Sequence, residues 1–579
     1  MISLMKNLKP YRLYVILVVV LTMAAILLEL NLPTLMANVI DIGIVNRDIP
    51  YILKTGGLMI ACSIASILLT ISVMFFSSRA SMGFGRDLRR KLFVHVESFS
   101  LQEFERIGPS SLITRTTNDI KQVQDVLTMM MRMMTRAPLM LIGGIMMAVS
   151  RDAFMSLIFL IALPLLAGTI YAITRKSIPL FGELQRRTDK LNLLLREGLI
   201  GVRVVRAFNR VAYEKQRFQE ANESFRDTGI RVGQSMALMF PVMMIIMNFT
   251  QIAIIWIGAT RIDAGLMQVG NLMAFLQYAS MILFSLIMLS MMLVMVPRAQ
   301  VSARRINEVL EQLPLIVDPK PGSSAQANLQ RGHVEFRNVT FRYAGAEKPA
   351  LEGISFRAVP GQTTAIIGST GAGKTSLVQL IPRFYEAEDG EVLVNGVDVR
   401  LQTQEELRSS IGYVPQKAVL FSGTVAENLR FGSEHADDAA LLAALETAQA
   451  LNFVQEKEGG LHAKIEQSGA NLSGGQKQRL SIARALVRKP DIYIFDDSFS
   501  ALDYATDARL RKALKREAGS AAVIIVAQRI STVVEADQII VLNEGRMAGI
   551  GTHAELLQSN EIYQEIVASQ LSPEGEEIA

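Results

Sequence analysis

The sequence predicts two successive domains of different fold class, a six-helix α-helical transmembrane domain followed by an α/β domain. Of its 579 residues, 50% are hydrophobic and 20% are charged, an average that usually arises when a membrane half is joined to an ordinary soluble half. Six apolar stretches of membrane-spanning length lie in the first half. From Val334 onward, short β-branched strands alternate with helical segments, which is typical of an α/β domain.

The composition also excludes several kinds of partner and site. The formal net charge is +5 and no dense run of lysine and arginine occurs, so we expect no nucleic-acid partner. Cys62 is the only cysteine, which excludes an intramolecular disulfide and a cysteine-based metal cluster. It lies in an apolar stretch, and we expect it to be a small buried hydrophobe rather than a redox group.

The first half is predicted to form six transmembrane helices, because each apolar stretch is long enough to cross a lipid bilayer. The stretches are Leu13 to Ala37, Ile52 to Phe76, Val126 to Val149, Phe154 to Ile173, Ala237 to Ala259 and Leu272 to Val296. The first stretch is too long for a removable signal peptide and lacks a small-residue cleavage site.

Basic residues set the predicted orientation. They gather before the first stretch and after the second, fourth and sixth, whereas the opposite connections are short and nearly neutral. By the positive-inside rule the basic side is the cytoplasm. The N-terminus and the α/β domain are therefore predicted to be cytoplasmic.

The two long cytoplasmic connections, after the second and fourth stretches, have amphipathic helical patterns with abundant charge. We therefore expect the spanning helices to continue well beyond the bilayer. Each connection has a break, at Gly108 to Leu112 and at Phe208 to Glu214, that is predicted to form a short transverse helix contacting the α/β domain. Simple loop tips are the alternative.

Polar residues and methionines within the apolar stretches are candidate ligand-binding groups. Glu29 and Gln277 are predicted at membrane depth, where such groups imply a function or an internal partner. Glu29 is close to the external end and precedes Asn31 and Pro33, which favours a structural role. Methionine-rich segments such as Met129 to Met134 suit varied apolar ligands, with ordinary packing as the alternative.

Composition shifts mark the predicted domain boundaries. The transmembrane domain is expected at residues 1–313, and a linker rich in proline, glycine and serine at 314–333. The α/β domain then covers 334–572, and a weakly acidic tail covers 573–579.

The first chemical motif of the α/β domain is a phosphate-binding loop between the strand Thr364 to Ile367 and a helix beginning at Ser376. Its residues are Gly368, Ser369, Thr370, Gly371, Ala372, Gly373, Lys374 and Thr375. Glycines let the backbone N–H groups surround phosphates, Lys374 places its charge on the β- and γ-phosphates, and the Thr375 hydroxyl binds magnesium. The predicted cofactors are therefore ATP and Mg²⁺.

A second motif, Ile492 to Asp503, begins as an apolar strand and ends in two adjacent acids. Ligands bind at the carboxyl ends of parallel strands, so Asp496 is the predicted magnesium carboxylate. Asp497 follows it where a nucleotide hydrolase places its general base. It is an aspartate where a longer glutamate is usual.

Between these motifs lie Gln416, after Ile411 to Pro415, and Leu472 to Gln476 leading into a helix. With the six spans and the phosphate loop, these residues make the chain resemble a half-transporter of the ATP-binding cassette (ABC) superfamily with the type IV exporter fold.

The resemblance implies further roles. Tyr343 would stack on adenine, and Gln416 would link magnesium to the membrane domain. Ser500 to Asp503 would lie between the two ATP sites. The signature loop would bind the γ-phosphate of ATP held by a partner, through Ser473, Gly474, Gly475 and Gln476.

The residues themselves also indicate a dimer. Ser473 to Gln476 forms a glycine-rich turn at a helix N-terminus, which is an anion-binding arrangement. One domain with two phosphate-binding loops suggests two nucleotides held between two domains. Six spans are also few for a translocation path, so we expect a second ABC half-transporter as partner.

Two positions depart from the active pattern of the family, and both belong to the predicted catalytic set of Gln416, Asp497 and Gln528. Asp497 replaces glutamate, and Gln528 replaces the histidine that contacts the γ-phosphate. Together they resemble the degenerate subunit of bacterial heterodimeric multidrug exporters.

The resulting prediction is an ATPase subunit that exports small amphipathic or drug-like molecules across a bacterial cell membrane. Its own ATP site is slow, and it supplies an intact signature loop to the partner's site. The alternatives are a slow homodimeric exporter, a lipid flippase, a metal-chelate importer and a membrane-anchored nucleotide-dependent regulator.

Overall fold

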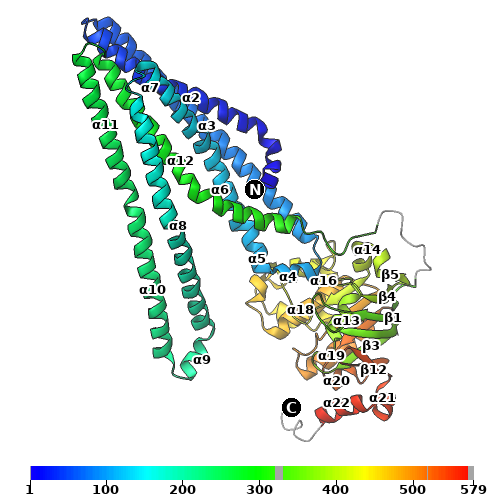
Figure 1. Cartoon of the computed structure of the whole chain (residues 1–579). Helices are drawn as coiled ribbons and strands as arrows, with labels where there is room; N and C mark the ends of the chain where they lie inside the picture. Colours follow the sequence, from blue (N-terminus) through cyan, green and yellow to red (C-terminus); the bar gives the residue numbers. More distant parts are fainter. Residues whose placement is uncertain (1, 320–329, 518, 572–579) are drawn as a thin grey trace. The chain divides into compact units, whose positions relative to one another are not determined.

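The computed structural model describes residues 2–319, 330–517 and 519–571, and it contains two compact units (Figure 1). The helical unit comprises Met1–Glu97 and Ser110–Gln312, and the α/β unit comprises Ser98–Pro109 and Leu313–Ala579. Residues 320–329 of the predicted linker and the whole predicted tail lie outside the described residues. The exact domain boundaries stay predictions.

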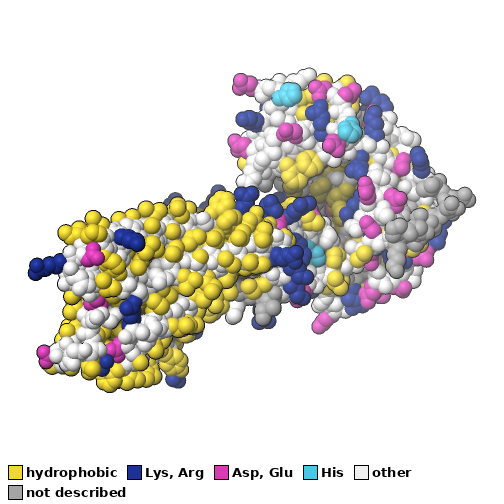
Figure 2. Space-filling view, turned by 90° about the horizontal axis from the view of Figure 1, so that it is seen from above, with side chains coloured by type: hydrophobic (Ala, Val, Ile, Leu, Met, Phe, Trp, Pro, Cys, Tyr) yellow, Lys and Arg dark blue, Asp and Glu magenta, His cyan; other side chains and the backbone are white. Residues whose placement is uncertain are grey.

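Six long apolar helical runs in the helical unit confirm the six predicted spans. They are Ser3–Ile44, Ile49–Glu97, Pro109–Arg151, Leu157–Ile200, Val211–Asp263 and Val269–Leu310. Each contains 42 to 53 residues, whereas about 20 residues cross the hydrocarbon core of a bilayer. Figure 2 shows hydrophobic side chains covering much of the visible surface of this unit. The helices are thus long enough to continue beyond the membrane, as predicted.

The elements of the helical unit follow one another with few irregular residues. They are α1 (Ile2–Met5), η1 (Lys6–Tyr11), α2 (Arg12–Asn38), η2 (Val39–Ile44), α3 (Ile49–Glu97), α5 (Pro109–Thr114), η3 (Arg115–Asp119), α6 (Ile120–Met129), η4 (Met130–Met134), α7 (Thr135–Arg151), α8 (Leu157–Ile200), α9 (Val202–Ala207), α10 (Val211–Ala237), α11 (Met239–Asp263) and α12 (Val269–Leu310). The segments η2, η3 and η4 are π-helical, and each adds a residue to one helical turn.

The helices form two groups within the unit. Helix α12 packs against α2 and α7, and α2 packs along α3. Phe275 and Tyr278 of α12 are fully buried, and the Tyr278 hydroxyl donates to the Leu30 carbonyl at 2.8 Å. Helices α8 and α10 run beside each other, joined by α9 (Figure 1). Cys62, expected to be buried, is half-buried on α3, a span of which only a small share is buried in the described chain.

Each of the two predicted breaks, at Gly108 to Leu112 and at Phe208 to Glu214, separates a short helix from the helix that follows it. The first short helix is α4 (Leu101–Ile107), which begins with a Ser100–Glu103 capping box and ends at Gly108, where φ is +82°. Glycine is favoured at such a left-handed end, so Gly108 terminates α4, and Pro109 begins the next helix, α5. The second is α9, which ends before Asn209, a residue with φ of +51°.

The α/β unit contains three sheets. The largest has six strands in the order β12-β11-β3-β10-β9-β6, and all of them are parallel except β12. The second is antiparallel and has four strands in the order β2-β1-β4-β5. The third consists of β7 paired with β8. The strands are β1 (Val334–Phe341), β2 (Leu351–Ala358), β3 (Thr363–Gly368), β4 (Asp389–Val394), β5 (Val397–Asp398), β6 (Ile411–Val414), β7 (Gly423–Thr424), β8 (Lys464–Ile465), β9 (Ile492–Asp496), β10 (Ala522–Val526), β11 (Gln538–Asn543) and β12 (Arg546–Gly551).

Short helices connect and cover these strands. They are α4, α13 (Lys374–Leu380), η5 (Val399–Leu401), α14 (Gln404–Ser409), α15 (Val425–Arg430), α16 (Asp438–Thr447), α17 (Leu451–Gln455), η6 (Gly460–His462), η7 (Gln467–Gly469), α18 (Gly474–Val487), α19 (Tyr504–Glu517), α20 (Ile530–Val533), α21 (His553–Ser559) and α22 (Glu561–Leu571). Strand β9 is buried along its whole length, with Ile492 and Ile494 in one apolar cluster and Tyr493 and Phe495 in another. A strand covered on both faces needs a continuous apolar run, which explains the sequence pattern.

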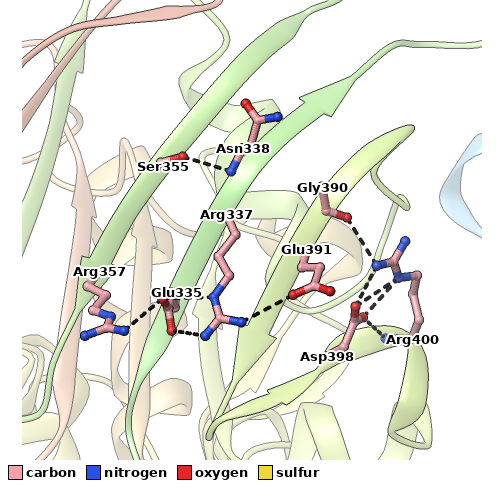
Figure 3. Close-up of polar contacts among 9 residues, drawn as sticks. All are labelled: Glu335, Arg337, Asn338, Ser355, Arg357, Gly390, Glu391, Asp398 and Arg400. Carbon is pink, nitrogen blue, oxygen red and sulfur yellow. Dashed lines mark hydrogen bonds and ion pairs between the residues drawn. The ribbon is translucent and has the colours of Figure 1, made fainter.

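The antiparallel sheet carries a row of charges across three strands (Figure 3). Glu335 of β1 accepts hydrogen bonds from Arg337 at 3.0 and 3.1 Å and from Arg357 of β2 at 2.9 Å. Arg337 also donates to Glu391 of β4 at 3.4 Å. The hydrogen bond from Arg337 holds the pKa of Glu335 below its usual value, although partial burial opposes this effect.

Candidate nucleotide-binding site

The candidate site lies at the carboxyl edge of the six-stranded sheet. The phosphate loop follows β3, Gln416 follows β6, Asp496 ends β9, and Gln528 follows β10. These four strands are adjacent and parallel, with β10 between β3 and β9 and with β6 beside β9. Parallel register therefore brings to one edge residues that are far apart in the sequence.

The phosphate loop is shaped by a glycine at its last turn. Gly373 caps α13 in the left-handed conformation, with φ of +95°, and a Cβ there would lie 2.7 Å from the Ala350 carbonyl oxygen. Only glycine adopts this positive φ without strain and has no Cβ to meet that carbonyl oxygen. Helix α13 consequently begins at Lys374, two residues before the predicted start. The first-turn N–H groups of α13 are then available to a phosphate.

Lys374 is buried within the loop it belongs to. Its side-chain Nζ donates to the carbonyl oxygens of Gly368 at 2.7 Å and Ser369 at 2.8 Å. Burial lowers the pKa of Lys374, and the charges of Asp497 and Asp496 oppose that shift. The ammonium group is therefore held by carbonyl groups of its own loop, within electrostatic reach of the two acids.

Asp496 and Thr375, the predicted magnesium ligands, contact each other. The Thr375 hydroxyl donates to Asp496 Oδ1 at 3.0 Å, and the Tyr413 hydroxyl donates to Oδ2 at 3.2 Å. Asp496 is 1% exposed, and burial raises its pKa although both hydroxyl groups lower it. Oxygen donors of this kind fit Mg²⁺, which takes further ligands from water and phosphates. Thr375 and Asp496 are the side chains that would hold it, whereas Gln416, the third predicted ligand, donates its amide to the neighbouring Asp497.

Tyr413 is a contact that sequence reasoning missed. It lies in the otherwise apolar strand β6, and its hydroxyl reaches the carboxylate that ends the neighbouring β9. The available signal was a tyrosine directly before the strand end and three residues before Gln416, at the edge where ligands bind. In the described chain no cluster of three or more His, Cys, Asp or Glu side chains forms a metal site.

Asp497 brings together the three predicted catalytic positions. Its Oδ2 accepts a hydrogen bond from Gln416 Nε2 at 3.0 Å and another from Gln528 Nε2 at 2.8 Å. The residue has φ of +45°, and its backbone N–H donates to the Val526 carbonyl at 3.0 Å. Both amides thus converge on one oxygen of a carboxylate that is 8% exposed.

Tyr343 and the signature loop occupy other places in the α/β unit. The Tyr343 hydroxyl lies 2.8 Å from Ser376 Oγ, so the ring is beside the phosphate loop, as adenine stacking would require. Ser473 caps α18 through a capping box with Gln476 and is exposed. Among the described residues no hydrogen bond joins the segment 473–476 to the phosphate loop. One chain therefore presents two separate phosphate-binding elements.

Comparison with known proteins decides the family. The ABC transporter transmembrane region matches residues 15–309, and the ABC transporter domain matches residues 351–500. The chain belongs to the ABC transporter family. This exporter half-transporter is a multi-pass membrane protein and an ATPase coupled to transport, with ATP and Mg²⁺ as cofactors.

Three relatives of this ABC transporter are informative. An ABC transporter ATP-binding protein of Mycobacterium tuberculosis (strain CDC 1551 / Oshkosh) is 42% identical over 98% of this chain and 97% of its own. The fatty acid ABC transporter ATP-binding/permease protein of Mycobacterium bovis is 33% identical over 83% of this chain and 75% of its own. A solved bacterial Atm1-family ABC exporter with ATP bound has a TM-score of 0.80 and 25% identity, covering 98% of this chain and 99% of the other.

Proposed function

We propose that this chain is the subunit with the slower ATP site in a heterodimeric exporter of amphipathic molecules in a bacterial cell membrane, with its α/β unit in the cytoplasm. The observation that carries the proposal is the arrangement around Asp497, where glutamine amides from two strand ends bind the same carboxylate oxygen.

The short side chain is the first reason for slow hydrolysis. An aspartate carboxylate is withdrawn by about 1.5 Å relative to a glutamate, and a misplacement near 1 Å can cost roughly 10²-fold in rate. The left-handed backbone of Asp497 and its N–H bond to Val526 fix the direction of that short side chain. The carboxylate therefore stays close to the sheet edge.

The two amide donors are the second reason. A general base must accept a hydrogen bond from the attacking water, and because Oδ2 already accepts from both Gln416 and Gln528, Oδ1 is the oxygen left for that water. Gln528 also lacks the imidazole of a histidine and cannot gain or lose a proton near neutral pH. The site is suited to holding ATP more than to cleaving it.

A partner subunit is supported by the signature loop and by an exposed apolar tip. The signature loop lies apart from the phosphate loop of its own chain, so it is available to a nucleotide on another chain. At the α8–α9–α10 turn, Leu199, Ile200 and Phe208 are 74 to 79% exposed. Such exposed apolar side chains mark contact surfaces.

The substrate class is supported by the helical unit and by one relative. Methionines are abundant in the spans, and their flexible side chains suit varied apolar ligands. The relative from Mycobacterium bovis is named a fatty acid transporter, and a fatty acid is amphipathic.

Intact mass tests the assembly. The tagged full-length chain is purified from its native host in mild detergent and weighed as an intact complex. A second half-transporter of different mass is expected at one copy per copy of this chain. A complex of twice the 63.9 kDa chain mass would contradict the heterodimer and support the homodimer.

ATP turnover tests the unequal sites in the same complex. Asp497→Asn is expected to leave most of the turnover, whereas changing the partner's catalytic Glu to Gln abolishes it. The double change Asp497→Glu with Gln528→His is expected to raise turnover, because it restores the usual base and histidine. If Asp497→Asn abolishes hydrolysis and the partner change does not, the assignment is wrong.

A further inference from the structure

The helical unit contains a cavity of about 610 Å³ between α2, α3, α12 and the η4–α7 segment. Its volume lies within the ~300–1,000 Å³ of typical small-molecule sites. Five of its lining residues are methionines: Met74, Met133, Met140, Met281 and Met288. Its charged lining residues are Glu29, Arg132 and Arg136. The cavity is therefore an apolar chamber that contains three charged groups.

Two of these charges neutralise each other. Arg136 Nη2 lies 2.7 Å from Glu29 Oε2 and 2.9 Å from Oε1, and the Ser66 hydroxyl donates to Oε1 at 3.1 Å. The Arg136 and Glu29 side chains are 33% and 19% exposed. Glu29 thus has the internal partner that the sequence suggested, and the pair adds no net charge to the cavity.

Arg132 supplies the remaining positive charge. Its Nε donates to Ser77 Oγ at 2.7 Å, and its Nη2 donates to Ser78 Oγ at 2.6 Å and to the Met74 carbonyl at 3.1 Å. All three partners are neutral. In the described part of the chain no carboxylate lies within ion-pair distance of Arg132, and its Nη1 makes no hydrogen bond. Two guanidinium N–H donors therefore remain for a ligand.

A second polar group at the cavity wall is also unsatisfied. Thr22 lines the cavity and is 4% exposed, and its hydroxyl has no hydrogen-bond partner among the described residues. A buried hydroxyl without a partner carries a free-energy cost that a ligand head group can remove after a side-chain rotation. The cavity therefore contains an unpaired hydroxyl group as well as a positive charge without a negatively charged partner.

We propose that this cavity binds an amphiphile with one anionic head group, a carboxylate or a phosphate on a long apolar chain, with Arg132 as the anion-binding residue. The proposal rests on the proposed export function and narrows its substrate class. An unpaired charge in the membrane is costly, and an anionic head group supplies the missing partner. Guanidinium groups match carboxylate and phosphate oxygens geometrically. Uncharged and cationic amphiphiles leave Arg132 uncompensated.

The experiment measures binding without ATP to the full-length protein in detergent micelles. Trp256, the only tryptophan, lies on α11 outside the cavity lining, and Phe284 lies in the lining. The reporter protein therefore carries Trp256→Phe and Phe284→Trp. The probes are 9,10-dibromostearate and its uncharged methyl ester, whose bromines quench tryptophan fluorescence at contact. Saturable quenching is expected for both probes. The affinity should be at least about 10-fold higher for the anion, because one charge-assisted hydrogen bond contributes about that factor to binding.

Variants of the reporter assign that preference to one residue. Arg132→Gln is expected to abolish the difference between anion and ester, whereas Arg132→Lys keeps most of it. The matched control is Arg151→Gln in the same helical run, Pro109–Arg151, where Arg151 donates to Asn271 at 3.0 Å outside the cavity lining. This control is expected to bind both probes as the reporter does. A brominated lysophosphatidate in the same assay distinguishes a phosphate from a carboxylate preference.

Equal affinity of the unmutated reporter for dibromostearate and its ester would overturn the proposal, whatever the variants do. An equal loss of preference in Arg132→Lys and Arg132→Gln would also overturn it, because charge would not be the cause. The binding assay contains no ATP. Its outcome is therefore independent of the turnover test at Asp497, and either proposal can fail alone.

Discussion

The nucleotide site and the membrane cavity both gather charged side chains in buried surroundings, but their residual charges have opposite sign. In the nucleotide site Lys374 stands against Asp496 and Asp497, which leaves one negative charge. In the cavity Arg132 and Arg136 stand against Glu29, which leaves one positive charge. The difference indicates what each site accepts: the first suits a metal cation with its nucleotide, and the second suits an anion.

The largest expected effect comes from removing the one negative charge in the cavity lining, that of Glu29. Glu29→Gln removes the partner of Arg136; loss of one member of a fully buried ion pair typically costs about 3–5 kcal/mol, which is an upper bound for this half-buried pair. We expect a marked fall in the thermal unfolding midpoint of the detergent-solubilised protein. The fall should shrink in Glu29→Gln with Arg136→Gln, because no uncompensated charge remains. An equal fall in single and double variants would show that the pair is not energetically coupled.

A smaller effect is expected from removing the one cation of the nucleotide site. Lys374→Met keeps an apolar stem of similar length but deletes the ammonium group. Loss of a charged hydrogen-bonding partner is worth about 1.5–3 kcal/mol, which corresponds to roughly 10- to 100-fold weaker nucleotide binding. Equilibrium binding of fluorescent ATP measures this change. Lys512→Met, at an exposed position on α19, serves as the matched control and should bind nucleotide at most slightly more weakly.

The hydroxyl contacts of Asp496 give a pH-dependent prediction. Burial raises the pKa of Asp496, and the hydroxyl groups of Thr375 and Tyr413 lower it. Tyr413→Phe removes one of these donors, so the pKa should rise further. Magnesium binds the ionised carboxylate, and the acid limb of Mg²⁺-ATP binding should therefore move to higher pH. Measuring Mg²⁺-ATP binding between about pH 5 and 8, where folded proteins are generally most stable, checks this shift. An unmoved limb would mean that Tyr413 does not act on Asp496.

The smallest expected effect concerns charges that are already balanced at the surface. Glu335 is held by Arg337 and Arg357, and its pKa is lowered, so its ion pairs stabilise the fold above the ordinary glutamate pKa and are lost as pH falls through the lowered value. Glu335→Gln should cost about 0.5 kcal/mol at pH 7 and progressively less on acidification. Thermal midpoints of both proteins at pH 7 and pH 4 check the sign. A difference that grows in acid would contradict it.

The sequence predicted the parts of the molecule that follow from local patterns. The spans are long apolar runs, β9 is a continuous apolar strand, and the phosphate loop has its glycines at fixed spacing, so each is visible within a short window. The convergence of Gln416, Asp497 and Gln528 was also predictable, since all three follow apolar strands that parallel pairing aligns.

Other features depend on contacts between distant segments. Nothing near Glu29 in the sequence identifies Arg136 as its partner, 107 residues away, because helix packing sets that pairing. Tyr413 reaches Asp496 only through the β6–β9 register. The short helix α4 was predicted a few residues late, because the capping box at Ser100 and Glu103 outweighed the Gly108–Pro109 break as its starting signal.

The π-helical segment η4 has a consequence for how such a cavity changes during evolution. Met130–Met134 holds one residue more than an α-helical turn, and Arg132 lies within it. A π-helical turn takes up its extra residue locally, so deleting a single residue there would restore α-helical geometry with the flanking turns kept in place. Arg132 would then turn away from Ser77 while Arg136 stayed with Glu29. A change of chain length by one residue, with no charge gained or lost in composition, would thus be enough to switch the ligand charge that the chamber selects.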